Sequence, residues 1–415
     1  MRQILLLLFL VIILINGCVK APENPEEIIP AADDSKATNE GLGIVVDANN
    51  QFALDLYLKF KDNPEYSENN IFFSPYSIST ALVMTYEGAR GKTAEEMRSV
   101  FYFPEDDDMR RYSFAKVYNL INKKDKKYKL HTANALWTQI DYPFLDEYLD
   151  LIEKYYAGKA TNLDFVDETE KSRKIINGWV EDKTRNKIKD LIPAGILDAD
   201  TRLVLTNAIY FKGTWLLQFN KEDTRQEDFK VIPEKTVKVD MMSIAGEEFN
   251  YAETDKLQIL KLPYEGEDLS MLIILPKEND LNSLEDSLSL EKLNELRNTL
   301  TKQKVDVFLP KFKFETKYFM EKTLIEMGMP SAFLNADFSG MDGTKDLFIS
   351  NVIHQAFVEV NEEGTEAAAA TGVVMKEVAI AENIIFRADH PFIFMIQERE
   401  TGNILFMGRV FDPTQ

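Results

Sequence analysis

The sequence predicts an α+β domain, in which helices pack against largely antiparallel sheets. Three observations predict this class. Apolar residues at helical spacing are concentrated in the first half of the chain, short apolar runs typical of buried strands occur throughout, and a hairpin pattern lies near the C-terminus. Because the helices and strands do not alternate in a regular βα order, the pattern favours α+β over α/β architecture.

The stretch SISTALVMTYEGARGKTAEEMRSVF predicts two helices in succession. Ile78, Leu82 and Tyr86 lie at helical spacing and share one face. We expect the second helix to begin at Thr93, because Glu96 follows at the spacing of a capping box. Both helices carry enough apolar residues to pack against a sheet.

Later segments add one more helix and several strands. KSRKIINGWVEDKTRNKIKDLI sets Ile176, Trp179 and Val180 at helical spacing. RLVLTNAIYFKGTW and LSMLIILP are near-continuous apolar runs, short enough to be buried strands. QAFVEV alternates, and FIFMIQERETGNILFMGRV predicts a hairpin that turns at Thr401–Asn403.

The N-terminus has the layout of an export signal, which we assign to residues 1–17. A basic residue precedes an unbroken apolar run that is too short to span a bilayer. The run ends in LINGC, which resembles a microbial lipobox with Cys18 as the lipidated residue, although Asn16 is unusual in that pattern. An ordinary cleaved signal is the alternative. We therefore expect an exported protein, either anchored by lipid at the extracellular face of the membrane or secreted.

Residues 18–44 are predicted to be a disordered tether, and residues 45–415 a single domain. The tether is rich in Pro, Glu, Asp and Ala and lacks periodicity. No second linker or internal repeat follows it. Cys18 is the only cysteine, so no intramolecular disulfide can form.

The charge balance argues against two classes of partner. The chain has 69 acidic and 48 basic residues, which gives a net charge of −21. Such a field repels nucleic acid and anionic lipid, so we expect no nucleic-acid partner and membrane association only through a lipid anchor. The lysine-rich segment at 122–129 is interpreted as a solvated turn, with contact to a polyanion as the alternative.

The chain lacks the patterns of an enzyme. His131, His354 and His390 are too scattered for a paired zinc motif, and no Walker loop, GxGxxG or GxSxG occurs. We interpret each histidine as a hydrogen-bonded structural residue. The sequence therefore predicts no catalytic residues, no metal and no cofactor.

Six segments, read in order, resemble the signature segments of the serpin family. They are NIFFSPYSISTAL, INGWVEDKTRNKIKDLI, LTNAIYFKGTW, LPKFKFET, FVEVNEEGTEAAAAT and HPFIFMI followed by GNILFMGRVFDP. Together they extend over most of residues 45–413. The resemblance implies a single domain of three β-sheets and eight to nine helices, with an exposed reactive loop near the C-terminus. We expect a monomer.

The reactive loop that the resemblance implies contains NEEGTEAAAATGVVMKEVAIAE, residues 361–382. Without the resemblance, a short helix after Thr365 is one interpretation, but about six residues do not sustain a helix alone. The alternative is a segment that becomes a strand, in which period-two parity places Thr365 on the inward face and Glu366 on the outward face. The resemblance assigns the hinge to Glu363, Gly364, Thr365, Glu366, Ala367, Ala368, Ala369 and Ala370.

The resemblance also assigns the remaining site residues. It implies a polar cluster beneath the central sheet, called the shutter, and an entry point for insertion, called the breach, at Trp215. Counting from the hinge glycine puts the cleaved bond at Val378-Ala379, while cleavage after Lys376 would indicate a trypsin-like target. The shutter residues are Ser74, Ser77, Asn207 and His354.

The implied function is suicide-substrate inhibition of serine proteases. In this mechanism the protease cleaves the loop, remains attached as an acyl-enzyme, and is carried away while the loop inserts as a strand. A small apolar bait residue suits an elastase-like enzyme first, a subtilisin-like enzyme second, and a papain-like cysteine protease third. The alternative is a non-inhibitory serpin that acts as a binding or chaperone-like module. The small residues of the hinge favour inhibition.

Overall fold

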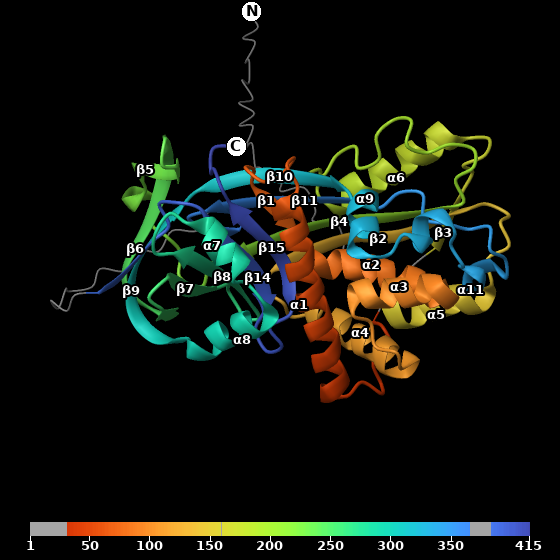
Figure 1. Ribbon diagram of the computed structural model, residues 1–415, viewed down its shortest axis with the longest axis horizontal. Coiled ribbons are helices and arrows are strands. Elements are labelled where there is room, and N and C mark those ends of the chain that lie inside the picture. Colours follow the sequence, from red (N-terminus) through yellow and green to blue (C-terminus); the bar gives the residue numbers. More distant parts are fainter. Residues whose placement is uncertain (1–30, 159, 366–382) are drawn as a thin grey trace, which may run out of the picture. The chain divides into compact units, whose positions relative to one another are not determined.

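The computed structural model describes residues 31–158, 160–365 and 383–415, and it confirms the α+β class (Figure 1). The α-helices in these residues are α1 (Asn39–Asp62), α2 (Pro75–Gly88), α3 (Gly91–Phe101), α4 (Asp107–Ile121), α5 (Asp146–Tyr156), α6 (Thr169–Lys183), α7 (Leu281–Asp286), α8 (Leu290–Thr299), α9 (Glu321–Met327), α10 (Ser331–Leu334) and α11 (Ser339–Asp342). The strands are β1 (Ile71–Phe73), β2 (Lys129–Gln139), β3 (Ala160–Leu163), β4 (Leu203–Thr214), β5 (Arg225–Ile232), β6 (Lys235–Glu253), β7 (Leu257–Pro263), β8 (Leu269–Pro276), β9 (Thr301–Pro310), β10 (Phe312–Phe319), β11 (Ile353–Asn361), β12 (Gly364–Thr365), β13 (Ile384–Arg387), β14 (Phe392–Glu398) and β15 (Ile404–Val410).

A six-stranded sheet carries most of the expected site residues. Its strand order is β10-β11-β12-β4-β2-β3, with a further direct pairing between β11 and β4. The strand β12 has only two residues, and it lies between one end of β11 and one end of β4. Beyond β12, the strands β11 and β4 pair directly in parallel.

Helices cover both faces of this sheet (Figure 1). On one face lies α2, which begins at Ser74 with a side-chain cap and has Pro75 in its first turn, both favourable at a helix start. On the other face lies α6, whose buried Ile176 and Val180 pack with Trp137 and other apolar residues of the sheet. The helical spacing predicted for both segments is confirmed.

A nine-stranded sheet forms the rest of the core, in the order β1-β15-β14-β8-β7-β6-β9-β13, with β5 paired to β6. The predicted hairpin is confirmed, since β14 and β15 pair antiparallel. The count of sheets differs from the three expected, because the 19-residue β6 pairs with β5, β7 and β9 and so joins two regions into one hydrogen-bonded sheet.

The count of helices also differs from the expected eight to nine. Eleven α-helices occur in the described residues, and four of them, α7, α9, α10 and α11, have only four to seven residues. The capping box expected at Thr93 is wrong, because α3 already begins at Gly91. Instead the Thr93 hydroxyl accepts a hydrogen bond from the Asp337 N–H, and Glu96 accepts one from Ser331.

The domain begins earlier in the sequence than the expected boundary at residues 44 and 45. That boundary falls inside α1, which starts at Asn39 with Thr38 as its cap. Residues 31–44 therefore belong to the folded domain, because they pack on α4 and α5 and carry part of α1. The assigned signal 1–17, Cys18 and the tether up to residue 30 lie outside the described residues.

No helix in the part of the chain that the structure describes is long and apolar enough to cross a membrane.

Candidate functional site

The strand β12 marks the start of the expected hinge. Gly364 and Thr365 pair antiparallel with β11 on one side and with β4 on the other. A side chain on Gly364 would lie 2.1 Å from the Gly213 carbonyl oxygen and 2.8 Å from the Thr214 Cα, so only glycine fits between the strands. The two strands therefore already hold the first residues of the hinge.

Thr365 points into the protein, as the parity argument expects. Its residue exposure is 1%. The Thr365 hydroxyl and the Tyr264 hydroxyl are 2.7 Å apart and form a hydrogen bond in which either can donate. This bond satisfies both buried hydroxyls, because an unpaired one would be costly at this depth.

Trp215, assigned to the breach, lies directly beside the hinge. Its indole N–H donates to the Asn361 carbonyl at 3.0 Å, and its backbone N–H donates to the Glu363 carbonyl at 2.9 Å. The indole ring stacks on the Tyr264 ring, with centroids 4.7 Å apart and planes 10° apart. Trp215 thus binds the backbone that precedes β12.

Two buried carboxylates anchor the same backbone to other elements. Glu362 accepts hydrogen bonds from Thr224 at 2.8 Å and from Lys311 at 3.1 Å. Burial opposes the charged form of Glu362, but hydrogen bonds from its own backbone, from Thr224 and from Lys311 outweigh burial and lower its pKa. Glu363 forms an ion pair with Lys221.

The four residues assigned to the shutter form one connected network. The Ser74 hydroxyl donates to the Leu405 carbonyl at 2.6 Å and caps the first turn of α2 by accepting from the Ser77 N–H at 3.1 Å. The Asn207 amide donates to the Ser77 hydroxyl at 2.8 Å, and its carbonyl oxygen contacts the His354 ring. The network therefore joins α2 to both β4 and β11.

His354 is held as a neutral imidazole with a defined tautomer. Its Nε2 accepts from the Ser74 N–H at 3.0 Å, so Nδ1 carries the proton and donates to Asn207. The side chain is fully buried, and desolvation lowers its pKa to about 3. The bond between His354 and Asn207 crosses from β11 to β4, at the place where these strands pair directly.

The strands β11 and β4 keep the same register across β12 as in their direct pairing. Across β12, Val360 of β11 stands opposite Gly213 of β4, a difference of 147 in residue number. In the direct pairing, Ile353 stands opposite Thr206, which is also a difference of 147. A strand that continued from β12 would therefore need the two strands to separate sideways, without sliding along each other.

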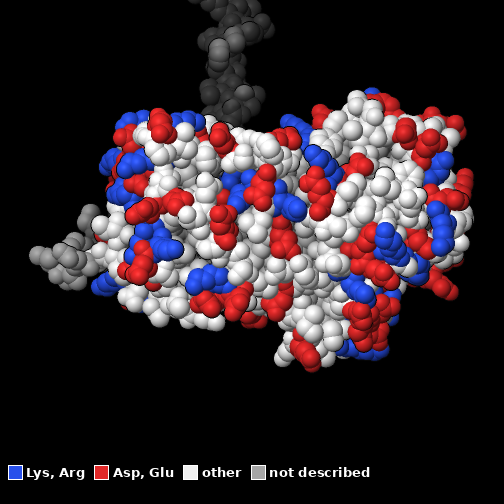
Figure 2. All heavy atoms as spheres, in the orientation of Figure 1, with Lys and Arg blue, Asp and Glu red and all other residues white. Residues whose placement is uncertain are grey.

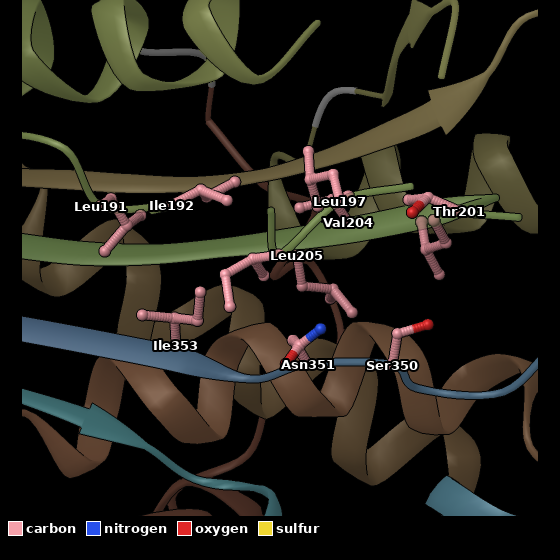
Figure 3. Close-up of a pocket in the computed structure, with 11 residues that line it drawn as sticks. Leu191, Ile192, Leu197, Thr201, Val204, Leu205, Ser350, Asn351 and Ile353 are labelled. Atoms are coloured by element: carbon pink, nitrogen blue, oxygen red, sulfur yellow. The ribbon is translucent and has the colours of Figure 1, made fainter. Parts of the chain in front are cut away.

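A pocket lies at the far end of the same seam, between β4, the start of β11 and the segment that connects α6 to β4 (Figure 3). Figure 3 shows Val204 and Leu205 on β4 and Ile353 on β11 around it. Its lining is mostly apolar, with polar side chains at Thr201, Ser350 and Asn351. The pocket thus lies at the opposite end of the pairing between β11 and β4 from β12.

The other sequence-predicted residues lie elsewhere. His390 bridges Asp389 and the Pro276 carbonyl, as a structural histidine does. In the lysine-rich segment, Lys123 pairs with Asp268. Residues 366–382, which contain Glu366, Ala367–Ala370 and Val378-Ala379, lie outside the described residues.

Sequence reasoning missed several residues of the site. Tyr264 holds Thr365, and Lys221, Thr224 and Lys311 hold the two glutamates that precede it. These residues come from separate segments, so no local pattern indicates that they meet.

The fold and this constellation define a class of α+β protein in which a two-residue strand, β12, lies at one end of the pairing between β11 and β4. Comparison with known proteins identifies the family. The profile described as serpin (serine protease inhibitor) matches residues 47–413. The chain belongs to the serpin family, a non-enzymatic family that takes its name from serine protease inhibitors.

Three relatives illustrate the similarity. An uncharacterized serpin-like protein of Methanosarcina acetivorans is 42% identical over 99% of this chain and 98% of its own length. The bovine leukocyte elastase inhibitor is 42% identical over 88% of this chain and 98% of its own. The crystal structure of Serpin48, a highly specific serpin of the insect Tenebrio molitor, has 36% identity and a TM-score of 0.79, covering 90% of this chain and 98% of that one.

Proposed function

We propose that the protein is a suicide-substrate inhibitor of serine proteases. One observation carries the proposal: Gly364 and Thr365 already pair with both β11 and β4, at the head of a seam whose register needs no slide. Residues that follow Thr365 can then add to the same two strands in sequence. Each inserted residue contributes about 0.5 to 1.5 kcal/mol of net hydrogen bonding, which drives the insertion forward.

The contacts around the hinge support a stepwise opening. Before β12, Trp215 binds the Asn361 backbone carbonyl, while Lys221 and Lys311 bind the side chains of Glu363 and Glu362. The position of this segment is therefore fixed before cleavage. Below β12 the seam is closed by backbone pairing and by the bond between His354 and Asn207. Insertion must break this bond, and the shutter therefore sets part of the barrier.

The proposed target is an elastase-like serine protease, with subtilisin-like and papain-like enzymes as further candidates. The bait residue by count is Val378, which is small and apolar. The 42% identity to a bovine protein named leukocyte elastase inhibitor agrees with this choice. The proposed reactive bond is Val378-Ala379.

The test is incubation with a panel of elastase-like, subtilisin-like, trypsin-like and papain-like proteases, followed by denaturing electrophoresis. We expect a complex with an elastase-like enzyme that survives boiling in detergent, and a released peptide that begins at Ala379. A peptide that begins at Glu377 would move the bait to Lys376. Cleaved protein beside fully active protease across the whole panel would overturn the proposal and favour the non-inhibitory, chaperone-like alternative.

We further propose export, with lipidation of Cys18 and display on the extracellular face of the membrane. The support is the sequence LINGC after an apolar run. Wild-type protein should then partition with membranes, and Cys18→Ser should be released or left unprocessed. Equal solubility of both forms outside the cell would reject lipidation.

A further inference from the structure

A surface cleft lies between α1, α3 and α9. Its volume is about 400 Å³, which falls within the range of small-molecule sites. The apolar residues Leu58, Val100 and Met327 line part of it. None of its lining residues belongs to the hinge, the breach or the shutter, so the proposed inhibition leaves this cleft without a role.

The charge of the cleft is negative. Asp55 and Asp62 of α1 and Glu326 of α9 line it. Lys59 is the one cation among the described residues that line it. Three carboxylates against one ammonium group leave a negative excess, which attracts a cationic ligand.

Asp55 is the carboxylate with the least compensation. It accepts hydrogen bonds from the Tyr102 hydroxyl at 2.6 Å and from the Gln51 amide at 2.9 Å. Both donors are neutral, and Asp55 forms no ion pair with any residue that the structure describes. Because Tyr102 is 45% exposed, a cation bound at Asp55 can also contact the face of the Tyr102 ring.

The other two carboxylates are paired only at the surface. Asp62 lies 3.3 Å from the Lys61 ammonium group, which lies closer to Asp286, at 2.6 Å. Glu326 lies 3.9 Å from Lys322. Such exposed pairs are weak, so both carboxylates remain available to a ligand.

The helix α1 fixes the distance between Asp55 and Asp62. Seven residues make nearly two turns, so the two side chains share one face, and their Cα atoms are about 10.5 Å apart along the helix axis. Leu58 and Lys59 lie between them on this face. The described residues contain no group of three or more His, Cys, Asp or Glu that could hold a metal ion, so a two-headed organic cation fits the cleft better than a metal ion does.

We propose that the cleft binds a linear diamine, an aliphatic chain with an ammonium group at each end. One ammonium group pairs with Asp55 and the other with Asp62, while the methylene groups cover Leu58. A chain with nine bonds between its nitrogens spans about 11 Å, because each bond of about 1.5 Å advances an extended chain by about 1.25 Å. Lys59 repels a third positive charge at the centre of the chain, so the site favours an uncharged centre over the charged one of spermidine. This inference does not depend on the inhibitory function.

The test is isothermal titration calorimetry of the full chain at low ionic strength, where surface charges are least screened. The probes are 1,8-diaminooctane, which spans both carboxylates, spermidine, which has the same span with a central charge, and 1,4-diaminobutane, which spans only about 6 Å. We expect saturable binding of one 1,8-diaminooctane per chain and at least about fivefold weaker binding of the other two. Equal affinities of the two diamines, or no saturable binding of 1,8-diaminooctane, would overturn the proposal.

Four variants locate the site. Asp55→Asn and Asp62→Asn should each weaken the binding of 1,8-diaminooctane about fivefold. Lys59→Gln should strengthen the binding of spermidine, a gain that a misfolded protein cannot produce. The matched control is Asp47→Asn, which removes the same charge from α1 outside the cleft and should bind as wild type does.

Two results with these variants would overturn the assignment. If Asp47→Asn weakens binding as much as Asp62→Asn does, the diamine responds only to the net negative charge of the chain. If Lys59→Gln leaves the affinity for spermidine unchanged, the ligand does not lie across the centre of the cleft.

Discussion

At the residue scale, Gly364 and Thr365 restrict which side chains can lie between β11 and β4. Gly364 leaves no room for a side chain between β11 and β4, and Thr365 turns its hydroxyl inward to Tyr264. If the chain continues as a strand after Thr365, the alternation of a strand would send the next odd-numbered residues inward and the even-numbered ones outward. The size and charge of each residue after Gly364 therefore bear directly on insertion.

Thr365→Arg should convert the inhibitor into a substrate. Thr365 is already buried in β12, so a guanidinium there should displace β12 from the sheet. Insertion must then bury the unpaired charge at a cost of several kcal/mol, and each 1.4 kcal/mol added to the insertion barrier slows insertion about tenfold. Hydrolysis of the acyl-enzyme then precedes trapping. The measurement is the number of inhibitor molecules consumed per protease inactivated, which should rise severalfold above the wild-type value.

The matched variant is Glu366→Arg, at the position of opposite parity. It should inhibit nearly as well as wild type, because an outward side chain stays in water. Should both arginine variants keep wild-type stoichiometry, or both lose it equally, the parity argument fails.

His354 should make the stability depend on pH. Burial lowers its pKa to about 3 from the ordinary 6.5, so the folded protein holds the neutral form. The stability from this site is complete above pH 6.5 and is lost as the pH falls toward 3, at about 1.4 kcal/mol per pH unit. Urea unfolding at pH 7, 5 and 4 gives the free energy of unfolding at each pH. The slope of this free energy against pH should be smaller in His354→Gln than in wild type, by the contribution of one proton. Equal slopes of the unfolding free energy against pH in wild type and His354→Gln would contradict the role of His354.

At the scale of elements, a buried carboxylate joins three helices. Glu87 of α2 accepts hydrogen bonds from Arg110 at 2.9 Å and Arg111 at 2.7 Å, both on α4, and from Tyr156 of α5 at 2.6 Å. The side chains of Glu87 and Arg110 are each 1% exposed. These contacts fix α2, α4 and α5 relative to one another.

Glu87→Gln should destabilise this helical unit by about 3 kcal/mol, because it leaves the Arg110 guanidinium buried with less countercharge. Asp107 still pairs with Arg110, so the loss stays below complete unfolding. The measurement is the free energy of unfolding in urea. The control is Glu295→Gln, which removes an exposed pair with Lys292 and should have no measurable effect. Equal losses of unfolding free energy in the two variants would show that the buried cluster contributes no more than an exposed ion pair.

At the scale of the whole molecule, the proposed insertion implies that the described fold is less stable than the form with its loop inserted. Thr365 already pairs in β12, so thirteen residues, Glu366 to Val378, remain to be inserted, and at about 0.5 to 1.5 kcal/mol each, insertion would gain roughly 6 to 20 kcal/mol. That gain is comparable with the entire stability of an ordinary domain, so barriers maintain the uninserted state. Acidic and basic side chains are interspersed over the face in Figure 2, and the excess of acidic residues favours solubility.

Cleavage within residues 366–382 should therefore stabilise the protein. A domain of this size unfolds with an entropy near 0.8 kcal/mol per degree, so the gain corresponds to a rise in Tm of about 8 to 25 °C. The measurement is thermal unfolding of intact and nicked protein at equal concentration. A nicked protein that melts at or below the temperature of the intact one would contradict insertion.

Local patterns predicted much of the fold. Helical spacing located α2 and α6, and the turn at Thr401–Asn403 located the hairpin of β14 and β15. The start of α3 was missed, because Thr93 uses its hydroxyl for a contact with Asp337 that no local pattern shows. The start of the domain was missed because residues 31–38 are mostly polar or alanine and are held by hydrogen bonds to α4 and α5 that no local pattern shows.

The sequence by itself determined the α+β class and the family, since these follow from short motifs and from spacing along the chain, and the resemblance to the family supplied the shutter and hinge as predictions. Only the tertiary structure decided which distant residues hold them. Tyr264 meets Thr365 across 101 positions, and Lys221 meets Glu363 across 142. The physical reason is that hydrogen bonds and ion pairs form where the packing of apolar faces brings side chains together. Sequence periodicity indicates which face of a helix or strand is apolar, but it does not indicate which element packs against that face.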